Sequence, residues 1–296
     1  MTVPSFVPFP YVCSEDITHY KFALQCYTAA LINFEPVRIE CGNTVQFRPL
    51  GLTLLAAMIH DLHLRGKDIL FTPPAKAETL QYLTDQGFFE EFDFRGPRQL
   101  LRRRANSKSV MLRRLDQFEG SYPMQIANWL VGNSNIPRYA IVEMVTVTLP
   151  EIIYNVFDHS KSLIGCCVCA QAYQSTKQLM ISVTDFGIGF LETLTRLYPQ
   201  LNSEASAVAL AIQPGVTSRA RQNNAGAGLH ILSEWLRIHH GDLEIISKDG
   251  VWKQFSDGKT MQMTLPFSFP GSSINLCIHT DLLQPTFHNQ EEDRYA

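Results

Sequence analysis

An acid and an amide stand four residues apart in the middle of the chain, at Glu151 and Asn155. If this stretch is helical, both side chains lie on one face, because residues i and i+4 are neighbours on a helix surface. A carboxylate can polarise a water molecule, and a carboxamide oxygen is a hard ligand of the kind that Mg²⁺ prefers. The pair therefore predicts a site for metal-assisted chemistry.

A second acidic position follows an apolar, β-branched run at residues 179–184, in the order Asp185-Phe-Gly187-Ile-Gly189. The run predicts a strand, and the two glycines allow the backbone to leave the sheet close to a ligand. Further along, Gly226-Ala-Gly228-Leu229 opens another apolar-periodic stretch. Glycines at a helix N-terminus free backbone N–H groups that can meet phosphates.

Acid, amide, acid and two glycine turns in this order resemble the Bergerat-type (GHKL) ATP fold of DNA gyrase B, the MutL repair proteins and sensor histidine kinases. The resemblance covers roughly residues 122–280 and implies an α/β sandwich that binds ATP and Mg²⁺. It implies that Glu151 activates water for attack on the γ-phosphate and that Asn155 binds Mg²⁺ together with the phosphates. It also implies that Asp185 accepts a hydrogen bond from the adenine amino group, with Gly187 and Gly189 close to the base and ribose.

The same resemblance implies a mobile ATP lid between residues 211 and 231, although His230 stands where histidine kinases usually have glycine. The implied nucleotide contacts in and after this lid are Thr217, Ser218, Arg219, Arg221, Gly226, Gly228 and Leu229. Family members also carry Gly-Thr before a late strand near the adenine. Both Gly258-Lys-Thr260 and Gly271-Ser272 fit that place, and we prefer the second, so Ser272 joins the expected site.

The first third of the chain has a different pattern. Strands are predicted at residues 37–41, 45–47 and 68–72, with helices at 52–65 and 75–86. This order resembles the STAS domain of anti-sigma-factor antagonists over roughly residues 15–93. That family carries an Asp-Ser pair with a phosphorylated serine where this chain has Arg48-Pro49, so we expect docking or dimerisation here rather than phosphorylation.

The expected fold class is therefore α/β, with a small STAS-like α/β domain before an α/β-sandwich ATP-binding domain. The second domain is predicted to contain helices at 124–131 and 137–159, with Pro150 kinking the latter or starting a fresh helix. Its strands are expected at 164–173, 179–184, 260–265 and 273–278. The expected divisions are a STAS-like domain at 1–95, a basic connector at 96–121, the ATPase domain at 122–283 and a flexible tail at 284–296.

Residues 95–114 carry eight basic residues and no acidic one. Such a segment could contact nucleic acid, phosphate or an acidic partner, and Arg102, Arg103 and Arg104 are its densest part. We favour a solvated connector, because the segment lacks the interleaved aromatic residues on which bases stack.

The composition of the 296-residue chain is that of an ordinary globular protein, with a formal charge of −3 and a pI near 6.3. This balance argues against a whole-protein affinity for nucleic acid or anionic membranes. Because the sequence lacks a membrane-length apolar run and a signal-peptide pattern, we expect a cytoplasmic protein without membrane contact. Of seven cysteines, Cys166, Cys167 and Cys169 cluster, but within an apolar run that predicts a buried strand, so we expect reduced core thiols.

Three functions follow from these observations. The first is a slow ATPase whose nucleotide state controls a protein partner through the STAS-like domain, with a homodimer possible. The second is a protein kinase, either a serine/threonine kinase of anti-sigma-factor type or a histidine kinase, for which Met58-Ile-His60-Asp61-Leu62 mimics an acceptor box. The third is a nucleotide-gated scaffold without turnover. A single helix around His60 does not supply the four-helix bundle that presents acceptor histidines, so we rank the histidine kinase lowest.

Overall fold

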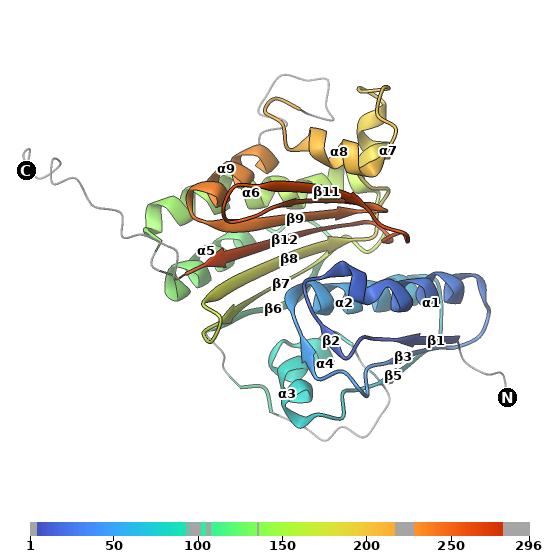
Figure 1. Cartoon of the computed structure of the whole chain (residues 1–296). Coiled ribbons are helices and arrows are strands. Elements are labelled where there is room, and N and C mark those ends of the chain that lie inside the picture. The colour runs from blue at the N-terminus through green and yellow to red at the C-terminus, as the bar shows by residue number, and fades with distance from the viewer. Residues whose placement is uncertain are drawn as a thin grey trace, which may run out of the picture.

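The computed structural model describes residues 5–92, 94, 102–104, 108–134, 136–216 and 228–280. Within these ranges the chain is a mixed α/β protein in which a small parallel sheet and a large antiparallel sheet lie on opposite sides of a helix layer (Figure 1). Thr217, Ser218, Arg219, Arg221 and Gly226 of the expected lid lie outside the described residues, as do the expected tail and the start of the basic segment.

The N-terminal unit is built on three parallel strands in the order β1 (Ser5–Pro8), β3 (Val37–Glu40) and β5 (Ile69–Thr72). A short parallel pair, β2 (Val12–Cys13) and β4 (Gln46–Phe47), lies beside it. Its helical elements are η1 (Ile17–Tyr20), α1 (Lys21–Ile32), α2 (Pro49–Leu64), α3 (Ala77–Asp85) and α4 (Phe88–Glu91). The helices expected near 52–65 and 75–86 are confirmed with shifted ends, whereas β1 and α1 were not predicted.

Helix α1 was not predicted from the sequence, because its apolar side chains are not confined to one face of the helix. Ala23, Leu24, Tyr27 and Ala30 are buried at helical spacing, but Phe22 and Ile32 are exposed apolar residues on the same helix. The two exposed side chains blur the periodicity that marks an amphipathic helix.

The C-terminal unit is a seven-stranded sheet in the order β11-β10-β9-β12-β8-β7-β6, in which every neighbouring pair is antiparallel. Its strands are β6 (Ser109–Leu115), β7 (Cys166–Tyr173), β8 (Gln178–Asp185), β9 (Gly241–Ser247), β10 (Gly250–Gln254), β11 (Thr260–Thr264) and β12 (Ser272–His279). Strand β6 lies within the stretch assigned to a solvated connector, so part of that basic segment belongs to the sheet. The adjacent basic residues Arg113 and Arg114 interrupt the apolar alternation of this strand, which in the described part of the chain pairs with β7 alone.

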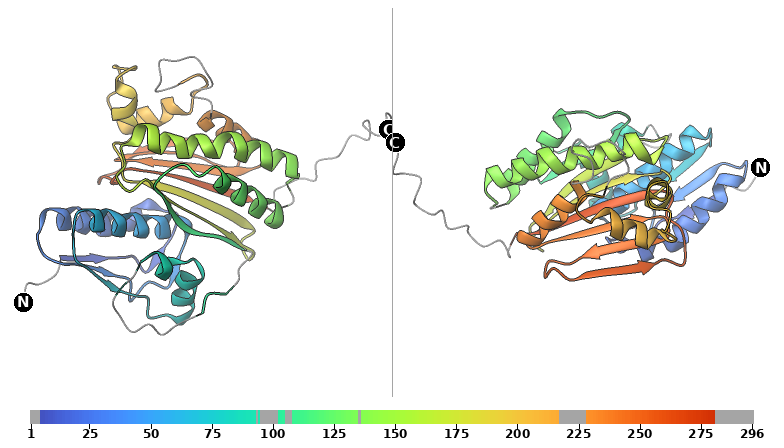
Figure 2. Two further views of the ribbon diagram at one scale, coloured as in Figure 1. Left: turned by 180° about the vertical axis from the view of Figure 1, so that it is seen from behind. Right: turned by 90° about the horizontal axis from the view of Figure 1, so that it is seen from above.

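Helices α5 (Ser121–Asn133), α6 (Arg138–Asn155) and α9 (Gly228–Ile238) cover one face of this sheet (Figure 2). Two short helices, α7 (Phe190–Thr195) and α8 (Glu204–Ala211), lie at one end of it. Helix α6 runs through Pro150 as one element, so the expected fresh helix does not begin there. A π-helical turn, η2 (Val156–Ser160), extends it.

Helix α2 lies between the two sheets, against β7 and β8 on one side and its own small sheet on the other. Its residues from Pro49 to Ile59 are all buried, which is typical of a helix that is covered all round. The hydroxyl of Thr53 joins it to the large sheet, with Oγ1 at 3.0 Å from Ser182 Oγ and 2.9 Å from Thr184 Oγ1. The N-terminal unit therefore packs on the face opposite to α5, α6 and α9.

The three clustered cysteines behave as expected. Cys166, Cys167 and Cys169 lie in β7, are buried and form no disulfide. Burial raises the pKa of each thiol well above its ordinary value, so these groups are unreactive core residues.

Candidate functional site

Asp185 ends β8 in the interior of the molecule, with only 6% of its surface exposed. One carboxylate oxygen, Oδ1, accepts the backbone N–H of Gly187 at 2.7 Å. Burial raises the pKa of Asp185 to about 7, against the opposing effects of the Gly187 hydrogen bond and the Lys248 ammonium. The carboxyl group thus titrates near neutral pH and in its ionised form is a strong hydrogen-bond acceptor.

The glycines around Asp185 are required by close backbone contacts. A Cβ on Gly187 would lie 2.3 Å from the carbonyl oxygen of Ser160, which also accepts the Ile188 N–H at 2.7 Å. Gly189 has a φ of +87°, and a Cβ there would lie 2.7 Å from Glu204 Oε1. The sequence motif therefore reflects a turn that no other residue type fits without rearrangement.

A third glycine, Gly271, closes the other side of this turn. A Cβ at this position would lie 2.2 Å from the Asp185 carbonyl oxygen, and the next residue, Ser272, is the cross-strand partner of Asp185. The alternative pair at Gly258 lies in the hairpin between β10 and β11, beside Arg237. Of the two candidates from sequence, Gly271-Ser272 is therefore the one at the acid.

Helix α6 supplies Glu151 and Asn155, which are half-buried and one turn apart near its C-terminal end. The π-helical turn that follows carries Ser160 to the Gly187 turn. Asn155 immediately precedes this turn and lies five residues before Ser160. The expected metal ligand and the expected adenine acceptor are thus joined by one continuous, packed element.

The carboxylate of Glu151 lies against the first residue of α9. A Cβ added to Gly228 would be 2.5 Å from Glu151 Oε2 and 2.6 Å from Cδ, so glycine is required for the two to meet. The start of a helix presents backbone N–H groups and a partial positive charge to an anion. Next in sequence, Leu229 is buried in the core between the helices and the sheet.

Two residues of this region were not predicted from sequence. Glu204 is buried at the start of α8, where Oε2 accepts the N–H groups of Phe190 and Leu191 at 3.2 Å each and the Ser247 hydroxyl at 2.8 Å. Burial raises the pKa of Glu204 against these hydrogen bonds. Its carboxylate fixes the start of α7 directly after Gly189.

Lys248 is the second unpredicted residue. It has a φ of +48° in the turn after β9, and its Nζ donates to the carbonyl oxygens of Gly187 and Pro270 at 2.6 Å each. The amine therefore ties the Asp185 turn to the segment that precedes β12. The Asp-Gly pair after it is a hairpin signal, but the reach of the amine depends on tertiary structure.

The basic segment is largely paired where the structure describes it. Arg103 bonds Glu90 at 2.9 Å, and Arg104 bonds Asp85 at 2.7 and 3.0 Å. Farther along, Arg113 pairs with Glu119. These acids lie outside the basic run in sequence, so the local excess of positive charge is smaller than the run indicates.

His60 lies on buried helix α2, where Nε2 is 3.0 Å from Glu91 Oε1 and the ring packs against Phe92 at 4.6 Å. A group packed in this way is a poor acceptor for a phosphoryl group. None of the described helices has the length and apolar character needed to cross a membrane. No protein-family model matches the chain, and no curated protein matches it.

Proposed function

We propose that this chain binds ATP with Mg²⁺ and hydrolyses it slowly, and that the bound nucleotide alters the contacts of the N-terminal unit or of a protein partner. One arrangement carries the proposal. A buried acid at a strand end is enclosed by closely packed glycines, and the helix that packs on this turn also directs Glu151 to the start of α9. The order of these residues along the chain resembles the GHKL ATPases.

In this proposal the ionised carboxylate of Asp185 accepts a hydrogen bond from the adenine amino group. Guanine has a carbonyl oxygen at the corresponding edge, so the same carboxylate disfavours it. The turn that holds Asp185 is fixed by Lys248 and Gly271 before any ligand binds. A pre-organised acceptor reduces the entropic cost of binding the base.

In this proposal, residues of α6 and of the start of α9 bind the phosphates and carry out their hydrolysis. Asn155 holds Mg²⁺ with the phosphates, and Glu151 orients and polarises the attacking water. Because Glu151 lies against Gly228, a phosphate that approaches the start of α9 also comes within reach of this carboxylate. Lid residues Thr217 and Ser218 complete the proposed phosphate contacts.

A direct route leads from this site to the N-terminal unit. Phe186, the residue after Asp185, contacts Tyr27 of α1, with ring centroids 5.7 Å apart, and Phe269 at 6.0 Å. The Tyr27 hydroxyl donates to Asp61 of α2, which also pairs with Arg65 at 2.6 Å. A nucleotide that contacts the residues around Asp185 would therefore also affect the packing of α1 and α2.

The STAS-like assignment of the N-terminal unit is part of the same proposal. Arg48, at the position where that family carries its aspartate-serine pair, stacks on Tyr173 of β7 at 4.2 Å and lies 3.3 Å from Met180 Sδ. This loop thus docks on the large sheet of its own chain. We propose that the unit acts as an internal partner that nucleotide can release or hold.

The test is incubation of the purified chain with γ-labelled ATP and Mg²⁺, separating free phosphate from label on protein. We expect free phosphate from the parent, none above background from Glu151→Gln, and parental release from the control Glu192→Gln. Glu192 is exposed on α7 and pairs with Lys161 at 3.5 Å, so its removal leaves the proposed site intact.

The other outcomes separate the alternatives. Label retained on the chain would favour autophosphorylation, and label passed only to an added serine-bearing protein would favour the serine/threonine kinase. ATP binding without either product would favour the nucleotide-gated scaffold. Absence of ATP binding would refute the site altogether.

A further inference from the structure

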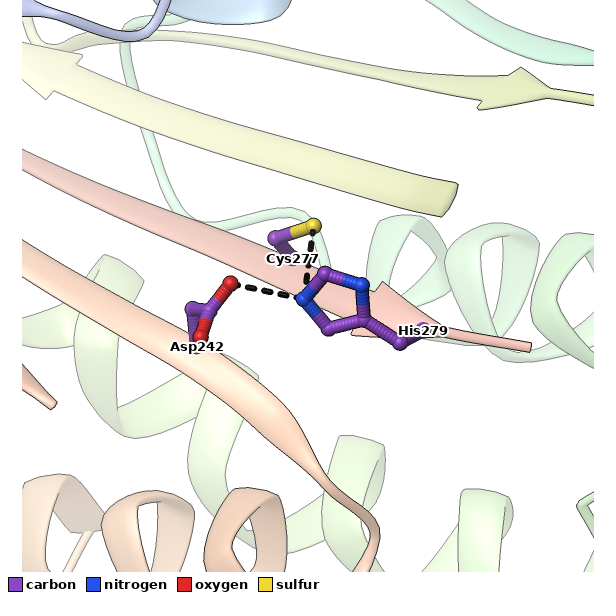
Figure 3. A group of neighbouring side chains, drawn as sticks. All are labelled: Asp242, Cys277 and His279. Carbon is purple, nitrogen blue, oxygen red and sulfur yellow. Dashed lines mark hydrogen bonds and ion pairs between the residues drawn. The ribbon is translucent and has the colours of Figure 1, made fainter. Parts of the chain in front are cut away.

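Three potential metal ligands of different chemistry meet on one face of the large sheet (Figure 3). Cys277 on β12 is the cross-strand partner of Asp242 on β9, and His279 follows two residues later on the same face of β12. His279 Nε2 lies 2.7 Å from Asp242 Oδ2 and 3.8 Å from Cys277 Sγ. Their ligand atoms all lie within 4.8 Å of one another. We call this group the Asp-Cys-His cluster.

These distances suit a tetrahedral metal ion. With metal–ligand bonds of about 2.0 to 2.3 Å, tetrahedral geometry separates two ligand atoms by roughly 3.3 to 3.8 Å. The Cys277–His279 separation already matches, and the Asp242–His279 pair needs to open by roughly 0.6 Å. The three side chains are half-buried, so an ion can reach them from solvent.

The carboxylate of Asp242 is already oriented. Its second oxygen, Oδ1, accepts the backbone N–H of Ser256 at 2.7 Å, which leaves Oδ2 directed at His279. Hydrogen bonds of this kind hold ligating carboxylates in place around protein metal ions.

The surroundings of the cluster supply a second acidic group. Besides Asp242, Glu15 also interacts electrostatically with Cys277. Glu15 Oε1 is buried and has no hydrogen-bond partner in the described part of the chain. A cation bound here would displace the thiol proton of Cys277 and the proton between His279 and Asp242 to solvent.

We propose that Asp242, Cys277 and His279 bind one divalent transition-metal ion, with Zn²⁺ preferred, and leave a fourth position open. Sulfur, imidazole and carboxylate ligands together select zinc-like ions over Mg²⁺, which requires oxygen ligands. A three-ligand site with an open position can hold water or a group from a partner.

This site is separate from the proposed nucleotide site. Ser272, at one end of β12, is opposite Asp185, whereas His279, at the other end, is opposite Gln178. Seven residues of strand at about 3.4 Å each put roughly 24 Å between the two ends. Metal binding here therefore does not depend on the ATP assignment.

The experiment is titration of the metal-free, reduced full chain with Zn²⁺ alone, together with the absorption spectrum after titration with Co²⁺. We expect one tightly bound Zn²⁺ per chain and a thiolate-to-cobalt charge-transfer band. Cys277→Ser, Asp242→Asn and His279→Gln should each weaken Zn²⁺ binding at least about tenfold, because even changes around the ligands cost about 10- to 100-fold.

Matched controls are Cys26→Ser, a half-buried thiol on α1, and His19→Gln, which removes a second His–Asp pair that lacks a cysteine. Both should bind Zn²⁺ like the parent, and so should Asp185→Asn. Equal Zn²⁺ affinity in Cys277→Ser and the parent, or a Co²⁺ spectrum without a thiolate band, would overturn the proposal. His279 and Asp242 would then form an ion pair without a metal ion. The spectrum needs no variant, so it decides the question even if a substitution prevents folding.

Discussion

Replacement of Asp185 by asparagine should change how stability depends on pH. The pKa of Asp185 is about 7 in the folded chain against 3.8 for a free aspartate. Between these values the folded state holds a proton that the unfolded state has lost, so the free energy of unfolding falls as pH rises through this window. Each pKa unit corresponds to about 1.4 kcal/mol, so the full effect is about 4 kcal/mol, of which about 3 kcal/mol falls between pH 5 and 8.

Asparagine keeps the size of the side chain and an oxygen that can accept the Gly187 N–H, but it does not titrate. Urea unfolding of parent and Asp185→Asn at pH 5 and pH 8 measures the difference directly. We expect the variant to gain about 3 kcal/mol relative to the parent on going from pH 5 to pH 8.

Glu244 and Glu15 also have raised pKa values, about 7 and about 8, chiefly through burial. They give both proteins the same slope in stability, so only the difference between the proteins reports Asp185. A difference that does not vary with pH would refute the assignment of a buried, titrating carboxyl group at this turn.

The same substitution should weaken ATP binding at pH 8, where the parent carboxylate is ionised. In the parent, ATP affinity should decrease when the pH is lowered below 7. Isothermal titration calorimetry across this pH range measures both effects. For Asn155→Ala, ATP affinity should lose its dependence on Mg²⁺, measured as equal Kd values with Mg²⁺ and with EDTA, and retention of a Mg²⁺ effect would exclude this ligand. For Gly228→Ala, the added Cβ would lie 2.5 Å from Glu151 Oε2 and displace that carboxylate, so kcat should fall at least about tenfold while ATP still binds. Gly132→Ala, where a Cβ meets nothing within 4 Å, is the matched control, and equal losses in both variants would argue against a specific Glu151 contact.

Local sequence determined the features that depend on near neighbours. The apolar run before Asp185 formed a strand, the cysteine-rich run formed the buried strand β7, and the apolar stretch after Arg48 formed α2. Gly187 and Gly189 were recognisable because a turn with such close backbone approach admits no side chain. Each of these signals lies within about ten residues, where chain geometry alone relates one position to the next.

Tertiary structure decided what depends on distant partners. Strand β6 exists because β7 pairs with it, and α1 is held by burial rather than by a regular apolar stripe. Glu204 and Lys248 meet the glycine turn only after three separate segments have packed, and no spacing along the chain encodes their hydrogen bonds. The Asp-Cys-His cluster likewise joins residues 35 positions apart through the register of β9 and β12, because cross-strand neighbours are set by hydrogen-bonded pairing and not by sequence distance.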